Sequence, residues 1–343
     1  MITKSAATFF FGLALAGAAK AADDKPLLGP LNITPADQAG TEQPRVEGRV
    51  SYLSGTLDTT ETDSFGTDKS AVKITGPYVA AAGVVPVGPV TIGLQAGYAP
   101  LVYKSTDTHT SKTPTTSAAP AFDFEFDATI ASASPLVAVQ LGNHLALGFR
   151  YNYETVKIKF KFSTGFPSSD DTSVVWGESA TLGLALELPS TTLGIAYQTR
   201  EWRLGPAPVA TLYGEQRVGS AISIGAVFAS RLQQFQRYDD GAEREDATID
   251  ALGTLGLAIG KHHRLSFLAG YLPKTSAGFD DLGHLGLTRT YGSGFRLGGE
   301  FELGLSHAVA LGFGLDFDDL GRKAGREASA KDVTISTRIA AKI

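Results

Sequence analysis

Apolar residues recur at every second position over runs of ten or more residues, and this alternation returns along most of the chain. In one run, Val309 and the apolar residues at positions 311, 313, 315 and 317 alternate with Ala, Gly and Asp. Because successive side chains of a β-strand point to opposite faces, each run predicts a strand with one apolar face. Strands of soluble sheets usually contain five or six residues, whereas a strand that spans a bilayer needs about 9–11. The lengths of the runs therefore favour membrane-spanning strands.

Followed along the chain, the pattern predicts fourteen strands. They lie near residues 45–57, 71–85, 90–103, 121–141, 145–163, 174–188, 192–204, 209–218, 221–235, 248–260, 264–273, 290–304, 308–317 and 332–343. Tight turns alternate with longer polar segments, which lie around residues 58–70, 104–120, 164–173, 236–247, 274–289 and 318–331. An even number of strands with short turns at one end and long loops at the other is the plan of an outer-membrane barrel. We therefore predict an all-β fold, a transmembrane antiparallel β-barrel of about 14 strands, over residues 45–343.

The first 21 residues have the features of an export signal. Lys4 precedes an apolar run from Phe9 to Ala19, and the small residues at positions 19 and 21 fit a cleavage site before Ala22. We expect this segment to direct the chain through the inner membrane of a Gram-negative cell toward the outer membrane. No later stretch contains the run of about 20 apolar residues that a spanning helix requires.

The composition excludes several classes of function. The 343 residues include no Cys, which rules out disulfides, cysteine-ligated metals and thiol catalysis. A net charge of -5 argues against a nucleic-acid-binding protein. No nucleophile motif, phosphate loop or metal-ligand spacing occurs, so we expect no enzyme, metal or cofactor. The expected partners are outer-membrane lipid and lipopolysaccharide, the barrel-assembly machinery and a small-molecule solute; the oligomeric state does not follow from the sequence.

Five tyrosines lie seven to ten residues from predicted tight turns. A tilted strand climbs roughly 2.5 Å per residue, so these side chains would lie about 18–25 Å above the turns. This is the height at which outer-membrane barrels carry an aromatic girdle against the lipid. The predicted girdle consists of Tyr78, Tyr98, Tyr151, Tyr197 and Tyr271.

If the apolar set faces lipid, the alternate set lines the lumen. On the strand near 145–163 we predict that the alternation shifts by one residue after Tyr153, which places apolar residues on the lipid side and lysines inside. The predicted charged residues of the lumen are Asp123, Glu125, Asp127, Arg150, Lys157, Lys159, Lys161, Arg296, Glu300, Glu302, Asp316 and Arg338. Leu101 and Tyr103 are candidates for an apolar part of the lumen.

The hairpin around Asn143 predicts a register for its charges. Folding the chain there pairs residues whose numbers sum to about 286, which brings Asp127 opposite Lys159. Cross-strand pairs of opposite charge stabilise a register by about 0.2–1 kcal/mol each. Such paired ladders would either fix the register or produce a field that orients a polar solute.

Residues 22–44 contain four prolines and predict an irregular segment. A fourteen-strand barrel has a backbone diameter of roughly 28 Å, which wall side chains alone do not fill. The segment would therefore either enter the barrel as a plug or extend into the periplasm.

Two hairpins in the middle of the chain resemble the long-chain fatty-acid transporter family of outer-membrane proteins. The resemblance rests on Leu145–Tyr151 with the lysine-alternating strand after it, on Leu182–Leu188, and on Leu193–Tyr197 with Trp202; elsewhere it extends to strand number. It implies a hydrophobic substrate that diffuses past an N-terminal hatch and leaves through the barrel wall.

These observations predict a barrel for the passive passage of small, preferably hydrophobic, molecules across the outer membrane. Two alternatives remain open at this stage. One is a general porin-like channel, and the other is a closed structural or surface-adhesion barrel without a transport role.

Overall fold

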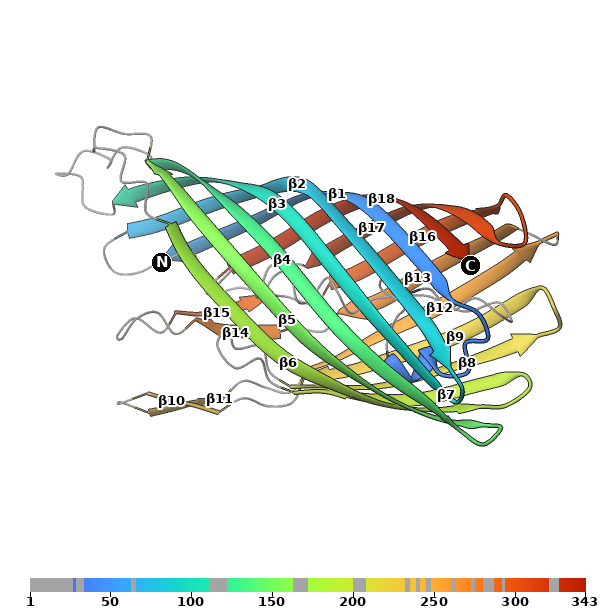
Figure 1. Ribbon diagram of the computed structural model, residues 1–343. Helices are drawn as coiled ribbons and strands as arrows, with labels where there is room; N and C mark the ends of the chain where they lie inside the picture. The colour runs from blue at the N-terminus through green and yellow to red at the C-terminus, as the bar shows by residue number, and fades with distance from the viewer. Residues whose placement is uncertain are drawn as a thin grey trace.

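The computed structural model describes residues 27–28, 34–62, 66–111, 122–162, 172–199, 208–231, 235–238, 241–244, 248–260, 263–272, 275–279, 287–291, 294–320 and 327–343. Within these ranges, fourteen antiparallel strands form one sheet, and the pairing of the first strand with the last closes it into a barrel (Figure 1). The predicted fold class is therefore confirmed. None of the helices among these residues is long and apolar enough to cross a membrane.

The barrel strands follow one another around the wall in chain order. They are β1 (Arg45–Thr62), β2 (Gly66–Val87), β3 (Val90–Ser111), β4 (Phe122–Leu141), β5 (Leu145–Phe162), β6 (Thr172–Glu187), β7 (Thr191–Gln198), β8 (Val209–Val218), β9 (Ile222–Arg231), β12 (Thr248–Ile259), β13 (His263–Leu272), β16 (Gly294–Gly304), β17 (Val309–Leu320) and β18 (Glu327–Lys342). Two small hairpins lie outside this set: β10 (Phe235–Tyr238) with β11 (Gly241–Arg244), and β14 (Thr275–Phe279) with β15 (Leu287–Tyr291). A single helical turn, η1 (Pro35–Gln38), precedes β1.

Tight turns join the strands at one end of the barrel. Gly88, Gly142, Gly219 and Gly260 occupy four of these turns with φ between 61° and 69°. This left-handed conformation costs glycine little and most other residues considerably more, so these positions favour glycine. At the opposite end, the strand ends are separated by longer stretches of sequence, for example between Ser111 of β3 and Phe122 of β4.

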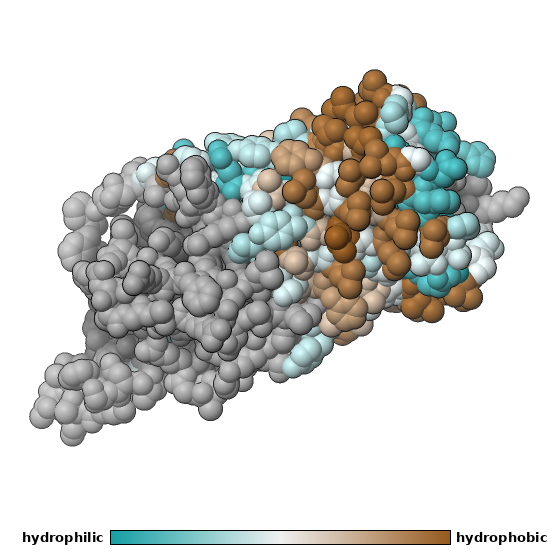
Figure 2. Space-filling model, turned by 90° about the horizontal axis from the view of Figure 1, so that it is seen from below, coloured by the Kyte–Doolittle hydropathy of each residue, from teal (hydrophilic) through white to brown (hydrophobic). Residues whose placement is uncertain are grey.

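The outer face of the barrel carries a band of apolar side chains. Figure 2 shows this band crossing the barrel between more hydrophilic zones. Its members alternate with inward residues along each strand, and many are about half exposed; examples are Val50, Leu94, Ile195, Phe313 and Ile335. Such a belt, about 25 Å tall, is the surface that an outer-membrane barrel presents to the hydrocarbon core of a bilayer.

Of the five predicted girdle tyrosines, Tyr98, Tyr151, Tyr197 and Tyr271 lie on the outer face by register. The prediction is wrong for Tyr78, which lies on the inner face of β2. It has the parity of buried Ala80, and a β-carbon added at the inward position Gly97 would lie 2.7 Å from its hydroxyl oxygen. The distance from a turn sets the height of a residue, whereas its parity sets the face.

The wall of the barrel is uneven in height. Strands β1 to β6 contain 16 to 22 residues, whereas β7 to β9 contain 8 to 10. At roughly 2.5 Å per residue, 22 residues climb about 55 Å, which is about twice the height of the apolar belt. Segments predicted as the loops 58–70 and 104–120 are therefore partly strand. Their many threonines make them polar, but a β-branched side chain also suits a strand that stands in water.

Candidate functional site: the lumen

Four charged residues predicted for the lumen lie on the outer face instead. The β4–β5 register does pair Asp127 with Lys159 as predicted, and it continues without a shift on both sides of Tyr153. The alternate positions are the buried ones, since Phe126 is 0% and Ile158 is 1% exposed. The residues that the register places outside are Glu125, Asp127, Lys157 and Lys159, whereas the side chains of Asp123 and Lys161 lie outside the described part of the structure.

The physical reason is that the apolar side chains change from the outer to the inner face partway along the strands. Within the apolar belt, β5 presents Leu147 and Phe149 outward. Beyond the belt the wall no longer faces hydrocarbon, so its outer positions can be charged, while the inner positions there, such as Val156, are apolar. This change of hydrophobic face mimics a shift in parity although the backbone continues unchanged.

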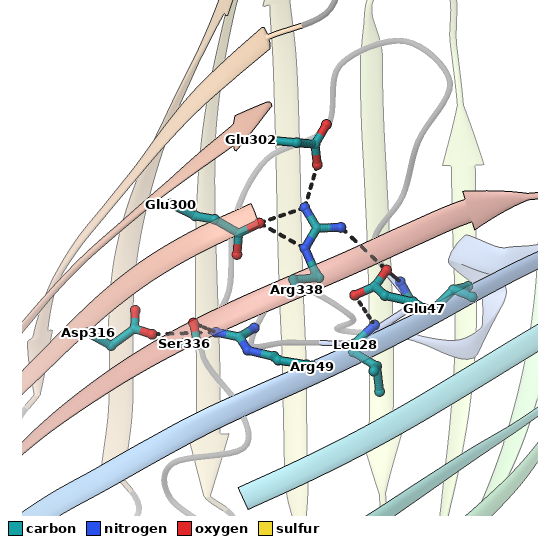
Figure 3. A network of polar contacts seen from close by, with 9 residues as sticks. Leu28, Glu47, Arg49, Glu300, Glu302, Asp316, Ser336 and Arg338 are labelled. Carbon is teal, nitrogen blue, oxygen red and sulfur yellow. Dashed lines mark hydrogen bonds and ion pairs between the residues drawn. The ribbon is translucent and has the colours of Figure 1, made fainter. Parts of the chain in front are cut away.

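One side of the lumen is lined by a cluster of buried charges around Arg338 of β18 (Figure 3). Its guanidinium Nε and Nη2 donate to Glu300 Oε1 at 2.9 and 2.6 Å, and Nη2 also donates to Glu302. Its Nη1 lies 3.4 Å from Oε2 of Glu47 on β1. The Arg338 side chain is 9% exposed and that of Glu47 is 0% exposed, so water screens this interaction little. The cluster connects β16 and β18 to β1.

A second group of polar contacts extends the same wall. Nη2 of Arg49 donates to Ser336 Oγ at 2.8 Å and lies 3.8 Å from Asp316 Oδ2 (Figure 3). Arg296 forms a two-bond pair with Asp318. The Arg49–Ser336 bond crosses the β1–β18 seam, so it favours the register in which the barrel closes, whereas the Arg296–Asp318 pair joins the neighbouring strands β16 and β17.

The structure thus brings together five of the lumen residues expected from the sequence: Arg296, Glu300, Glu302, Asp316 and Arg338. Sequence reasoning missed Glu47, Arg49 and Asp318 as members of this group. Their signal was present, since Glu47 and Arg49 alternate with outward Val46 and Val50. The β18 partners of Glu47 and Arg49 lie almost a full chain length away, and no local pattern reveals that proximity.

Of the described residues before β1, Leu27, Leu28 and residues 34–39 are buried inside the barrel. Glu47 accepts the backbone N–H groups of Leu27 and Leu28 at 2.9 and 3.1 Å, and Gln95 of β3 donates to Leu27 O at 2.8 Å. The two leucine side chains pack on inward residues of β2 and β4, which are Ala80, Ala82, Val84 and Leu136. One buried carboxylate therefore contacts both Arg338 and the N-terminal segment.

The helical turn η1 occupies the lumen at the tight-turn end. It packs on the inner faces of β4, β5 and β6, where small residues make room; these are Ala138, Ala146, Gly148, Gly183 and Ala185. A β-carbon at Gly148 would overlap the backbone of Ala36. Two strands beyond β6, the Tyr213 hydroxyl of β8 donates to Asp37 Oδ1 at 2.5 Å. The turn is therefore held by its packing on β4 to β6 and by a hydrogen bond from β8.

Farther from the tight turns, the inner faces of β2 to β5 are apolar. The members of this apolar wall are Val72, Ile74, Leu101, Tyr103, Phe126, Ala128, Ile130, Val156 and Ile158, each at most 8% exposed. The rings of Tyr103 and Phe126 stack with centroids 4.4 Å apart and planes 9° apart. Leu101 and Tyr103, the apolar candidates from the sequence, belong to this wall.

Arg150 lies on the inner face of β5, below the apolar wall. Its Nη1 lies 3.5 Å from Gln95 Oε1, the same glutamine whose amide nitrogen binds Leu27. Arg150 thus stands beside the N-terminal segment, on the side of the lumen away from the Arg338 cluster.

The pairing between β2 and β3 is interrupted beside the apolar wall. It runs up to Thr75 opposite Val102 and resumes at Val79 opposite Tyr98. By the same register Pro77 lies opposite Pro100, and a proline has no N–H group to donate to a ladder. The outer neighbours β1 and β4 remain paired with these strands at the same level. The interruption therefore affects one seam of the wall.

No family model matches the chain, and no curated protein sequence matches it. Solved structures do. A deletion mutant of the TodX monoaromatic hydrocarbon channel aligns with a TM-score of 0.65 at 11% identity, over 96% of this chain and 97% of that one. In fold, the chain resembles an outer-membrane channel.

Two further structures support the same resemblance. The P. putida toluene transporter TodX aligns with a TM-score of 0.62 at 10% identity, over 96% of this chain and 99% of that one. A Pseudomonas aeruginosa FadL homologue aligns with a TM-score of 0.59 at 10% identity, over 96% and 97%. The resemblance to fatty-acid transporters expected from two hairpins thus extends over the whole fold, while the low identity limits what is shared to the fold.

Proposed function

We propose that the protein is an outer-membrane channel for the passive passage of small hydrophobic molecules. The observation that carries the proposal is the apolar wall, which lines the inner faces of β2 to β5 beside the interrupted seam. Burying about 150 Å² of apolar surface, the scale of a small aromatic molecule, is worth about 4 kcal/mol. A solute of this kind is therefore more stable among such apolar side chains than in water.

The contacts of the N-terminal segment favour a path in which the solute leaves through the barrel wall over a path along the barrel axis. Residues 27–28 and η1 occupy the lumen between the apolar wall and the tight-turn end. The β2–β3 seam lacks ladder bonds at Pro77 and Pro100, so opening it breaks few hydrogen bonds. A solute on the apolar wall would leave sideways through this seam into the hydrocarbon of the bilayer. We propose transport and no catalytic role; the relatives in fold described above are named as channels and transporters.

A cross-link across the seam tests this route. The chain has no Cys, so Pro77→Cys with Pro100→Cys introduces one defined pair. The paired residues on either side, Thr75 with Val102 and Val79 with Tyr98, hold the two strands at ladder spacing, so the intervening prolines lie near the Cα separation that a disulfide spans. Val85→Cys with Ile92→Cys is the matched control, because this pair lies on the same strands and the same face where the ladder is continuous.

The assay is uptake of a monoaromatic hydrocarbon by cells or liposomes that contain each variant. We expect oxidation to abolish uptake through the Pro77/Pro100 variant, reduction to restore it, and the control pair to transport in both states. Undiminished uptake by the oxidised Pro77/Pro100 variant would exclude the lateral route. A steady ionic conductance of the unmodified chain in a planar bilayer would favour a porin-like channel instead.

A further inference from the structure

The outer face of β2 to β5 carries a group of lysines beyond the apolar belt. We call this group the lysine band; its members are Lys69, Lys73, Lys104, Lys157 and Lys159. Lys104 lies six residues after the half-exposed Tyr98, and Lys157 lies four residues after Tyr153. At roughly 2.5 Å per residue, the band begins about 10–15 Å beyond these interfacial aromatics. This is the level of lipid headgroups rather than of hydrocarbon.

The charges within the band are unevenly matched. Lys104 Nζ lies 3.1 Å from Glu125 Oε2, and Lys159 is opposite Asp127. Lys73, however, lies directly opposite Lys104, and like charges at such positions destabilise a sheet. An anion bound between them would remove that cost.

Lys157 adds a further cation without a carboxylate opposite it. Its register partners are Thr129 on β4 and Val174 on β6. Glu178, the next acidic residue on the outer face of β6, lies nearer the turns, where its side chain is hydrogen-bonded to Tyr151. Between Lys73 and Lys157, the outer wall therefore carries more positive charge than the residues opposite these lysines neutralise.

We propose that the lysine band binds the phosphate groups of lipopolysaccharide in the outer leaflet. Three features support this occupant: the band faces outward, it lies at headgroup height above the apolar belt, and it sits on the tall side of the barrel away from the tight turns. Clusters of lysine beside a membrane surface recognise anionic headgroups through the same electrostatics. This binding is independent of what passes through the lumen.

The chain offers a matched control for the band. Among the described residues, Lys331 of β18 also lies on the outer face at this end of the barrel and is 59% exposed. Its Nζ lies 3.2 Å from Asp319 Oδ2 of the neighbouring strand. A lysine that already has this partner would contribute little to an added phosphate.

The experiment measures binding of phosphorylated lipid A to the full chain folded in detergent micelles. The test variant combines Lys69→Gln, Lys73→Gln and Lys157→Gln, none of which lies opposite a carboxylate by register, and the control is Lys331→Gln. Each lysine near an anionic lipid surface contributes about a factor of five, so we expect roughly 100-fold weaker binding by the triple variant. We expect no measurable change in Lys331→Gln, and weaker binding of the unmodified chain at higher salt.

Two further arms separate phosphate recognition from other causes. The triple Lys→Arg variant at the same positions keeps the charges and should retain binding, and heat-dependent gel mobility verifies that each variant is folded. Dephosphorylated lipid A should bind the unmodified chain as weakly as phosphorylated lipid A binds the glutamine variant. Equal binding of both lipids, or an equal loss in Lys331→Gln, would overturn the proposal. Lysine-dependent binding of phosphatidylglycerol with the same affinity would overturn its assignment to lipopolysaccharide.

Discussion

Removing the guanidinium of Arg338 should destabilise the barrel strongly. In Arg338→Met, the carboxylates of Glu47, Glu300 and Glu302 would lose the cation that all three contact. Glu47 is fully buried and the other two are at most 26% exposed, so water compensates only in part. Deleting one partner of a buried ion pair typically costs about 3–5 kcal/mol. We expect a loss in this range, because the attraction to three carboxylates is replaced by repulsion among them.

The measurement is urea unfolding of the chain in detergent micelles, followed by the fluorescence of its two Trp residues. A second variant, Arg338→Met with Glu300→Gln and Glu302→Gln, removes the repulsion and should recover more than half of the loss. The matched control is Arg217→Met, on the inner face of β8 near its tight turn and away from this cluster. A loss below about 1 kcal/mol for Arg338→Met, or no recovery in the triple variant, would refute the reasoning.

Two predictions concern η1. Gly148→Leu places a side chain where the backbone of Ala36 lies, so it should displace η1 and raise ion conductance in a planar bilayer; Gly83→Leu, on the outer face of β2, should leave conductance unchanged. Closed channels in Gly148→Leu would show that η1 does not obstruct the lumen. Tyr213→Phe removes the hydrogen bond to Asp37 and should increase proteolytic cleavage of residues 34–44 by about 10- to 100-fold, as expected for the loss of about 1.5–3 kcal/mol from a bond to a charged group. Unchanged cleavage would mean that the packing of η1 on β4 to β6 holds it alone.

The strands and their order could be predicted because they depend on local information. Alternation identifies each strand, and tight turns such as Gly142–His144 fix the pairing of its neighbours. The β4–β5 register followed from one turn and is confirmed over the whole hairpin. The charged lumen residues near Arg338 could also be predicted in part, because they alternate along their strands with residues of a clearly apolar face.

The remaining features depend on what surrounds each face, which alternation does not reveal. On β5 the apolar residues change from the outer to the inner face when the strand leaves the belt, so Val156 and Lys157 suggested a shift of parity that does not occur. The distance of Tyr78 from its turn predicts its height but not the face of the strand on which it lies. The contacts of Leu27 with Glu47 and of Asp37 with Tyr213 join distant parts of the chain, and the proline-rich segment has no period that could predict them.

The seam between the first and last strands has a consequence for how the chain folds. The hydrogen bond between Arg49 and Ser336 joins residues 287 positions apart, and its formation requires every intervening strand to be in place. Contacts of such separation form late, because the entropy of closing a long loop is lost before the contact stabilises the chain. Until then β1 and β18 are open sheet edges, on which Glu47 and Arg338 remain hydrated. Closure dehydrates both charges in one event, so the final step should be all-or-none and should slow when either charge is lost.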